Sequence, residues 1–198
     1  MSGEEGRSVP LCVDLDGTLI RTDLLAESVL SLLRKDPLAA FRLPFWLLRG
    51  KAHLKRRIAE RVDLSAAALP YDSEFLDFLK EERAAGRPLV LVTASDRKYA
   101  QAVAEHLGIF SDVIASDGAT NLLGETKLEV LHEKFADGFD YAGDSFRDLP
   151  VWRGARRAIL VRAGEAVVRT ATAHGNVWKV FEKRGGRLSE LLRALRRA

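Results

Sequence analysis

The sequence is poor in cysteine and has no long apolar run, and each absence excludes a class of protein. With Cys12 as its only cysteine, the chain cannot form an intrachain disulfide, so we expect a reducing, cytoplasmic environment. No apolar run approaches the roughly 20 residues that cross a bilayer, and the polar first residues show no signal-peptide pattern. The four histidines lie on different predicted helices without metal-ligand spacing. A disulfide scaffold, a membrane-spanning protein and a histidine-based metal site are therefore not expected.

The chain does have enough apolar residues for a core, and its charge is unevenly distributed. Its 198 residues, 47% of them hydrophobic, fit one domain or one domain with a small accessory one. The net charge of +3 conceals two basic segments: residues 34–61 hold nine basic and two acidic residues, and residues 179–198 hold seven and two. These segments suit an anionic partner such as phosphate, lipid head groups or nucleic acid, or they are solvated helix faces.

Short apolar runs alternate with helical patterns along most of the chain. This alternation predicts an α/β fold, a doubly wound parallel sheet with crossover helices on both faces. The exception is a stretch of successive helices without a strand, which predicts an all-helical cap inserted near the start of the core. We expect the core to comprise residues 1–20 and 71–198 and the cap to comprise residues 21–70. A final helix is expected over residues 187–197.

The first predicted strand, residues 9–15, leads into a carboxylate pair, Asp14 and Asp16. Residues two apart in a strand point to the same side, so both carboxylates are aimed together past the strand's end. Two carboxylates at such a short distance repel each other unless a cation lies between them or they share a proton. Asp-Gly is also an ordinary turn dipeptide, so this stretch alone leaves a surface turn as an equal alternative.

Other predicted strands also end in reactive residues. The second ends in Thr93-Ala94-Ser95, and the fourth ends in Gly143-Asp144, with Asp148 one helical turn later. Lys127 begins the helix before that fourth strand. In open parallel sheets, ligands bind at the carboxyl ends of the strands. The predicted fold would therefore gather four carboxylates, several hydroxyls and a lysine at one edge.

These residue types suit phosphoryl transfer. Several carboxylates with one lysine need a hard divalent cation, and Mg²⁺ prefers oxygen ligands. A carboxylate can attack phosphorus to give an aspartyl-phosphate intermediate. The cation, the lysine, hydroxyl groups and backbone N–H donors would hold the equatorial oxygens, where negative charge accumulates. The sequence therefore predicts a Mg²⁺ site that takes a small-molecule phosphate as substrate.

Over residues 9 to about 161, the four motifs resemble those of the haloacid dehalogenase-like (HAD) superfamily of phosphohydrolases. The resemblance implies a Rossmann-like core with Asp14 as nucleophile and Asp16 as general acid/base. It also implies that Thr93, with Ala94, binds the phosphoryl group. Lys127 would neutralise the phosphate and the nucleophile.

The same resemblance implies the metal ligands and the type of reaction. Magnesium would be held by Asp14, Asp144 and the backbone carbonyl of Asp16, with Asp148 as a further ligand or as support. Dehalogenases of the superfamily are disfavoured, because they use no metal and need no second acid at the position of Asp16. A phosphatase is favoured over a phosphomutase, which stays open.

A helical cap between the first two motifs selects substrates in this superfamily, and phosphoserine phosphatases share that layout. The acid on their cap that meets the substrate's amine corresponds to about the position of Asp23. Asp23 is equally well explained as the N-cap of the following helix. Ser95 is a further candidate for substrate contact. A phosphoserine-phosphatase-like enzyme is therefore an alternative to hydrolysis of another small organic phosphate.

The predicted cap combines aromatic and basic residues. Phe41, Phe45 and Trp46 lead into a basic run that begins at Arg49. Such a composition is typical of an interfacial helix on anionic lipid, although the apolar residues could equally pack the cap core. An accessory module that binds a membrane or a partner is therefore the alternative from a different functional class. No nucleic-acid motif accompanies the basic residues, so a nucleic-acid partner is not expected.

The whole chain also resembles the soluble HAD-like domain that is fused to UbiA-type prenyltransferases. The cap, the Thr-Ala-Ser second motif and the fourth motif (residues 143–150) carry this resemblance. It implies a prenyl- or sugar-linked phosphate as substrate, and a peripheral position at a membrane surface or on a membrane enzyme.

Overall fold

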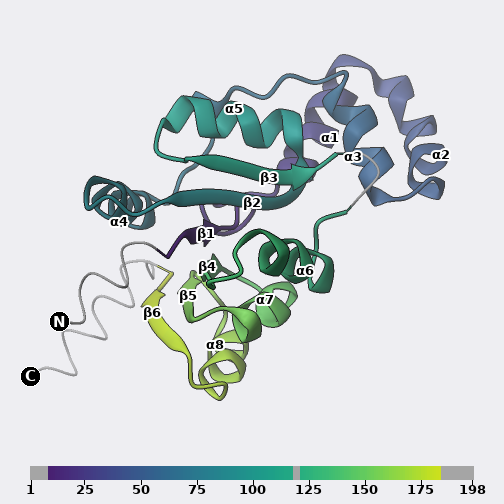
Figure 1. The fold of residues 1–198 in the computed structure, drawn as a ribbon. Coiled ribbons are helices and arrows are strands. Elements are labelled where there is room, and N and C mark those ends of the chain that lie inside the picture. Colours follow the sequence, from purple (N-terminus) through teal and green to yellow (C-terminus); the bar gives the residue numbers. More distant parts are fainter. Residues whose placement is uncertain (1–8, 118–120, 184–198) are drawn as a thin grey trace, which may run out of the picture.

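The computed structural model describes residues 9–117 and 121–183, and within them a six-stranded parallel sheet forms the centre of the molecule (Figure 1). The strand order is β3-β2-β1-β4-β5-β6, with all neighbouring strands parallel. The predicted α/β fold with a doubly wound parallel sheet is confirmed. The strands are β1 (Leu11–Val13), β2 (Leu89–Asp96), β3 (Asp112–Ser116), β4 (Asp140–Gly143), β5 (Arg157–Val161) and β6 (Val177–Phe181).

Helices cover both faces of the sheet because successive strand residues face opposite sides. On one face, Leu11 and Val13 pack with α4 (Ser73–Ala84) and α5 (Arg97–Leu107). On the other face, Cys12 joins the core formed with α6 (Glu125–Lys134), α7 (Leu149–Gly154) and α8 (Glu165–Thr172). Cys12 is fully buried, and burial raises the pKa of its thiol, as expected of an inert core residue.

The segment between β1 and α4 is helical, as predicted, and lies beyond the carboxyl ends of β1 and β2 (Figure 1). It contains α1 (Leu24–Lys35), a 3-10 helix (Pro37–Phe41), α2 (Leu43–Leu48) and α3 (Lys51–Ala59). Its own small core includes Leu32, Trp46 and Ile58. We call this helical segment, residues 21–70, the cap; its status as a separate domain stays a prediction.

One detail of the cap, one of the tail and one of the helices in general bear on the sequence predictions. Pro44 is the second residue of α2, in the first turn, where a proline is tolerated, and the preceding 3-10 helix ends at Phe41. The predicted final helix over 187–197 lies outside the described residues. Within residues 9–117 and 121–183, no helix combines the length and hydropathy of a membrane span.

Candidate active site

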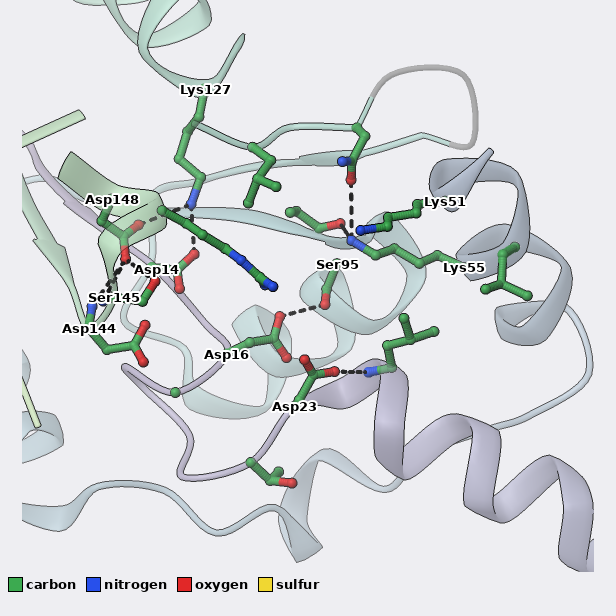
Figure 2. Close-up of a pocket in the computed structure, with 18 of the residues that line it drawn as sticks. Asp14, Asp16, Asp23, Lys51, Lys55, Ser95, Lys127, Asp144, Ser145 and Asp148 are labelled. Atoms are coloured by element: carbon green, nitrogen blue, oxygen red, sulfur yellow. Dashed lines mark hydrogen bonds and ion pairs between the residues drawn. The ribbon is translucent and has the colours of Figure 1, made fainter. Parts of the chain in front are cut away.

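A pocket of about 590 Å³ opens between the carboxyl ends of the strands and the cap (Figure 2). The strand ends contribute the carboxylates, and the cap contributes basic and apolar side chains. Its lining consists of Asp14, Asp16, Gly17, Arg21, Thr22, Asp23, Leu25, Leu47, Lys51, Leu54, Lys55, Ala94, Ser95, Asn121, Leu123, Lys127, Asp144, Ser145, Arg147 and Asp148.

A buried ion pair lies at the base of the pocket. Lys127, in the first turn of α6, places its Nζ 2.7 Å from Oδ1 of Asp14, which directly follows β1. The same Nζ donates to the Tyr141 hydroxyl at 2.7 Å, and that hydroxyl donates to Oδ1 of Asp148 at 2.8 Å. Burial raises the pKa of Asp14, although Lys127 opposes this shift. Burial alone would lower the pKa of Lys127, but the charges of Asp14 and Asp148 together raise it.

The second carboxylate group comes from the turn after β4. Oδ2 of Asp148 accepts hydrogen bonds from the backbone N–H groups of Asp144 and Ser145, at 3.2 and 3.1 Å, and from the Ser145 hydroxyl at 3.1 Å. Asp148 is therefore fixed by the turn and by Tyr141, and it in turn fixes the backbone that presents Asp144 to the pocket. Burial and the charge of Asp148 raise the pKa of Asp144 to about 6.

Two glycines allow this concentration of carboxylates. Gly17 has a φ of +80°, which favours glycine, and a Cβ there would collide with the carboxylate of Asp144. At Gly143, a Cβ would lie 2.7 Å from Cγ of Asp148. The Asp-Gly and Gly-Asp dipeptides of the sequence thus have a packing function as well as a turn function.

The donor set fits a hard divalent cation. Asp14, Asp144 and Asp148 each offer one carboxylate oxygen, and these three oxygens lie within 4.8 Å of one another. Like charges so close together raise one another's pKa unless a cation neutralises them, and the raised pKa values of Asp14 and Asp144 agree with this. Carboxylate oxygens are the ligands that Mg²⁺ prefers. The carboxylate of Asp16 does not belong to this cluster.

Asp16 instead connects the sheet to the cap. Its Oδ1 accepts from the backbone N–H of Leu24, at the start of α1, at 2.7 Å. Its Oδ2 accepts from the Ser95 hydroxyl at 2.6 Å and from the Thr93 hydroxyl at 3.4 Å. Burial raises its pKa, while the hydrogen bonds from Leu24 and Ser95 act in the opposite direction. A buried carboxyl with a raised pKa, at the edge of the pocket, is suited to donate and accept a proton.

The second motif lies at the end of β2, as the sequence indicated. β2 extends to Asp96 with an irregular register after Thr93, so Ala94 and Ser95 belong to the strand. Ala94 and Ser95 line the pocket, whereas Thr93 is fully buried and is absent from the lining. The Thr93 hydroxyl accepts from the backbone N–H of Ser95 at 3.0 Å, so in this structure it supports the strand end.

Asp23 is the N-cap of α1, and its contact with a substrate stays a prediction. Its Oδ1 accepts from the backbone N–H groups of Leu25 and Ala26, at 2.8 and 3.1 Å, which makes it the N-cap of α1. It also lines the pocket opposite the carboxylate cluster (Figure 2).

Several pocket residues were not predicted from the sequence. Lys51 and Lys55 lie four residues apart on α3 and therefore share a face, which is directed into the pocket (Figure 2). Nζ of Lys55 donates to the carbonyl of Ala94 at 2.6 Å and to Oδ1 of Asn121 at 3.3 Å. The spacing of the two lysines was readable in the sequence. Tyr141 carried no such signal, because it resembles any core residue of a buried strand.

The parallel α/β fold and the carboxylate cluster at its strand ends narrow the class of protein, and the comparison with known families is specific. Residues 11–153 match the model of the haloacid dehalogenase-like hydrolases, and the chain belongs to this family. A curated relative, the uncharacterized protein y4nM of Sinorhizobium fredii, is 42% identical over 159 residues, which are 80% of this chain and 31% of the relative. The chain thus spans about a third of that relative's length.

Solved structures share the fold at low sequence identity. A protein of unknown function from Bordetella pertussis gives a TM-score of 0.65 at 21% identity, covering 88% of this chain and 99% of that one. A phospho-aspartyl intermediate analogue of phosphoserine phosphatase gives 0.60 at 17% identity, covering 95% and 99%. A HAD family hydrolase from Salmonella enterica gives 0.63 at 16% identity, covering 90% and 68%. The predicted membership of the HAD superfamily is confirmed.

Proposed function

We propose that the chain is a Mg²⁺-dependent phosphomonoester hydrolase that acts through a phosphoaspartate at Asp14. The observation that carries this proposal is the position of Asp14. It belongs to a cluster of three carboxylates within 4.8 Å, and it also accepts from Lys127 Nζ at 2.7 Å. A cation on one side and an ammonium group on the other would hold the non-bridging oxygens of a phosphate next to this carboxylate.

The proposed reaction has two steps. A carboxylate oxygen of Asp14 attacks phosphorus, and the bond to the leaving oxygen breaks while Asp16 gives that oxygen a proton. A water molecule then attacks the phosphoaspartate, Asp16 takes a proton from it, and inorganic phosphate leaves with Asp14 restored. Lys127 balances negative charge on the phosphoryl oxygens throughout. Magnesium, held by Asp14, Asp144 and the Asp16 carbonyl with Asp148 as ligand or support, would supply further charge neutralisation.

The pocket walls indicate the kind of leaving group. Four leucines from three cap helices and from the segment before α6 line the pocket, so part of the substrate meets an apolar wall. Basic side chains from α3 and from the turn after β4 stand beside them. We therefore favour a small organic phosphate with an apolar portion, a description that includes a prenyl-linked phosphate. The leucines are Leu25, Leu47, Leu54 and Leu123, and the basic residues are Lys51, Lys55 and Arg147.

Phosphoserine is the second candidate substrate, and the position of Asp23 favours it. This carboxylate lines the pocket across from the carboxylate cluster, where it could meet an amine, and Lys55 could meet a carboxylate. Against it, both Asp23 and Lys55 already have partners within the protein.

A substrate panel tests the proposed function. Purified protein with Mg²⁺ is incubated with phosphoserine, sugar phosphates, short prenyl phosphates and p-nitrophenyl phosphate, and released inorganic phosphate is measured. We expect turnover that EDTA removes and Mg²⁺ restores, with the apolar phosphates preferred over phosphoserine. No release from any phosphomonoester would refute the proposal.

Replacing Lys55 by Met tests the contribution of the cap. Methionine keeps the apolar stem but removes the charge, so a charge-assisted contact with an anionic substrate disappears. We expect KM for p-nitrophenyl phosphate to rise by about tenfold, the value of one such contact, with a smaller change in kcat. Lys80→Met, an exposed lysine of α4, is the matched control. Equal KM values for Lys55→Met and Lys80→Met would show that Lys55 does not contact the substrate.

A further inference from the structure

The cap has an exposed apolar surface that its own core does not use. Leu38, Phe41, Phe45 and Leu48, which we call the apolar cap face, are each between 65% and 83% exposed. The spacing of three residues places Leu38 and Phe41 on one side of the 3-10 helix, and it places Phe45 and Leu48 on one side of α2. Trp46, on the opposite side of α2, packs into the cap core beneath the guanidinium of Arg61.

Exposed apolar side chains are ordinary when they are scattered, but a contiguous cluster marks an interaction surface. Here five of the nine large apolar side chains with substantial exposure in the described chain fall within eleven consecutive residues: the four of the apolar cap face and Leu47. The cluster also borders the pocket, because Leu47 lines the pocket and the adjacent Leu48 belongs to the apolar cap face.

The charge around this face indicates what it contacts. Residues 30–51 contain five basic residues and one acidic residue, Asp36, which is paired with Arg42 at 2.9 Å. The basic residues are Arg34, Lys35, Arg42, Arg49 and Lys51, and all five are exposed. A second copy of the chain would bring the same positive charge against itself, which disfavours self-association.

The structure also separates this face from the other basic residues of the cap. Lys55 is directed into the pocket, and Arg56 and Arg57 pair with Glu60 at 3.4 and 2.9 Å. The basic run in the sequence is therefore divided. From Lys51 onward it serves the pocket and the cap's own ion pairs, so Arg49 is the basic residue of this run that adjoins the apolar cap face.

We propose that the apolar cap face docks on an anionic lipid surface. The two phenylalanines and two leucines would enter the boundary between head groups and acyl chains, and the surrounding arginines and lysines would contact the anionic head groups. Because Leu47 and Lys51 belong to the pocket lining, docking in this way brings the pocket opening to the lipid surface.

Vesicle co-sedimentation tests this docking without any measurement of activity. The 198-residue chain is mixed with vesicles of phosphatidylcholine alone and with vesicles that also contain phosphatidylglycerol. We expect binding to the anionic vesicles that weakens when ionic strength rises from about 0.1 M to about 1 M. Phe41→Ser/Phe45→Ser should weaken that binding by about tenfold or more, because two aromatic side chains no longer leave water. Arg42→Gln/Arg49→Gln should also weaken binding to the anionic vesicles. The binding that remains should depend less on ionic strength than that of the unchanged chain.

Matched variants elsewhere on the molecule serve as controls. Val180→Ser removes an exposed apolar side chain on β6, and Arg153→Gln/Arg169→Gln removes two exposed charges on α7 and α8. Both should bind anionic vesicles like the unchanged chain. The proposal would be overturned if the unchanged chain failed to bind anionic vesicles. It would also be overturned if Phe41→Ser/Phe45→Ser bound them as strongly as the unchanged chain. A dimer in light scattering that the phenylalanine variant dissociates would also overturn it in favour of self-association.

Discussion

Asp14→Asn is expected to lower phosphatase turnover by about 10³-fold or more. An amide cannot attack phosphorus as a carboxylate does, and the substitution also removes one oxygen from the cluster of three carboxylates. The side chain keeps its shape, so the buried contact with Lys127 loses its charge but leaves no cavity. Initial rates on the best substrate of the panel, measured at saturating Mg²⁺, provide the test.

The control for this substitution is Asp137→Asn, which removes a carboxylate from the opposite end of the sheet, beside the start of β4. Its turnover should equal that of the unchanged chain. Turnover of Asp14→Asn within tenfold of the unchanged chain would show that another group is the nucleophile.

Asp144→Asn is expected to stabilise the metal-free protein and to abolish its response to Mg²⁺. The pKa of Asp144 is raised to about 6 in the folded protein, first by burial and then by Asp148. Its ionisation therefore opposes folding, and this cost appears as pH rises through 6. At pH 8 the amide should raise the Tm of the metal-free protein by about 2–4 °C, the shift expected for each kcal/mol in a chain of this size.

The gain from Asp144→Asn should shrink as the pH is lowered from 8 toward 5, because the native carboxyl then becomes protonated. Saturating Mg²⁺ should raise the Tm of the unchanged chain, since a ligand that binds only the folded state stabilises it. The same addition should leave Asp144→Asn unchanged. Thermal melts at several pH values with EDTA or Mg²⁺ measure both effects. If metal-free Asp144→Asn melted at a lower temperature than the metal-free unchanged chain, the assignment of Asp144 as a metal ligand would be contradicted.

The sequence predicted the sheet and the motif positions because parallel sheets obey strong local rules. Buried strands are continuous apolar runs, and the first, second and fourth runs ended in polar residues that the structure brings to one edge of the sheet. Asp14, Lys127, Asp144 and Asp148 were therefore found without knowledge of any long-range contact. The structure brings these four within one connected set of hydrogen bonds and ion pairs.

The details that the sequence did not provide depend on contacts between distant segments. Thr93 was expected to bind the phosphoryl group, which stays a prediction; the sequence did not show that its hydroxyl donates to Asp16 and accepts from the backbone N–H of Ser95. Tyr141 connects Lys127 with Asp148, and only the packed core reveals that its hydroxyl lies between them.

The cap was the hardest part to predict because its composition allowed two packings. Phe41, Phe45 and Trp46 formed one aromatic cluster in the sequence, and nothing local distinguished a core residue from a surface residue. The structure divides them: Trp46 is buried in the cap core, and Phe41 and Phe45 are exposed. Likewise, Lys55 belonged to a uniform basic run in the sequence, yet it alone reaches the Ala94 carbonyl at the end of β2.

The most direct test of the central claim is detection of the phosphorylated enzyme itself. The unchanged chain and Asp16→Asn are quenched in acid during turnover of the best substrate, and peptides from each are analysed by mass spectrometry. We expect one added phosphoryl group on the peptide that contains Asp14. The adduct should be more abundant in Asp16→Asn, where hydrolysis of the acyl phosphate lacks its general base. Turnover with no phosphoryl adduct in either protein, or an adduct on another residue, would contradict the account.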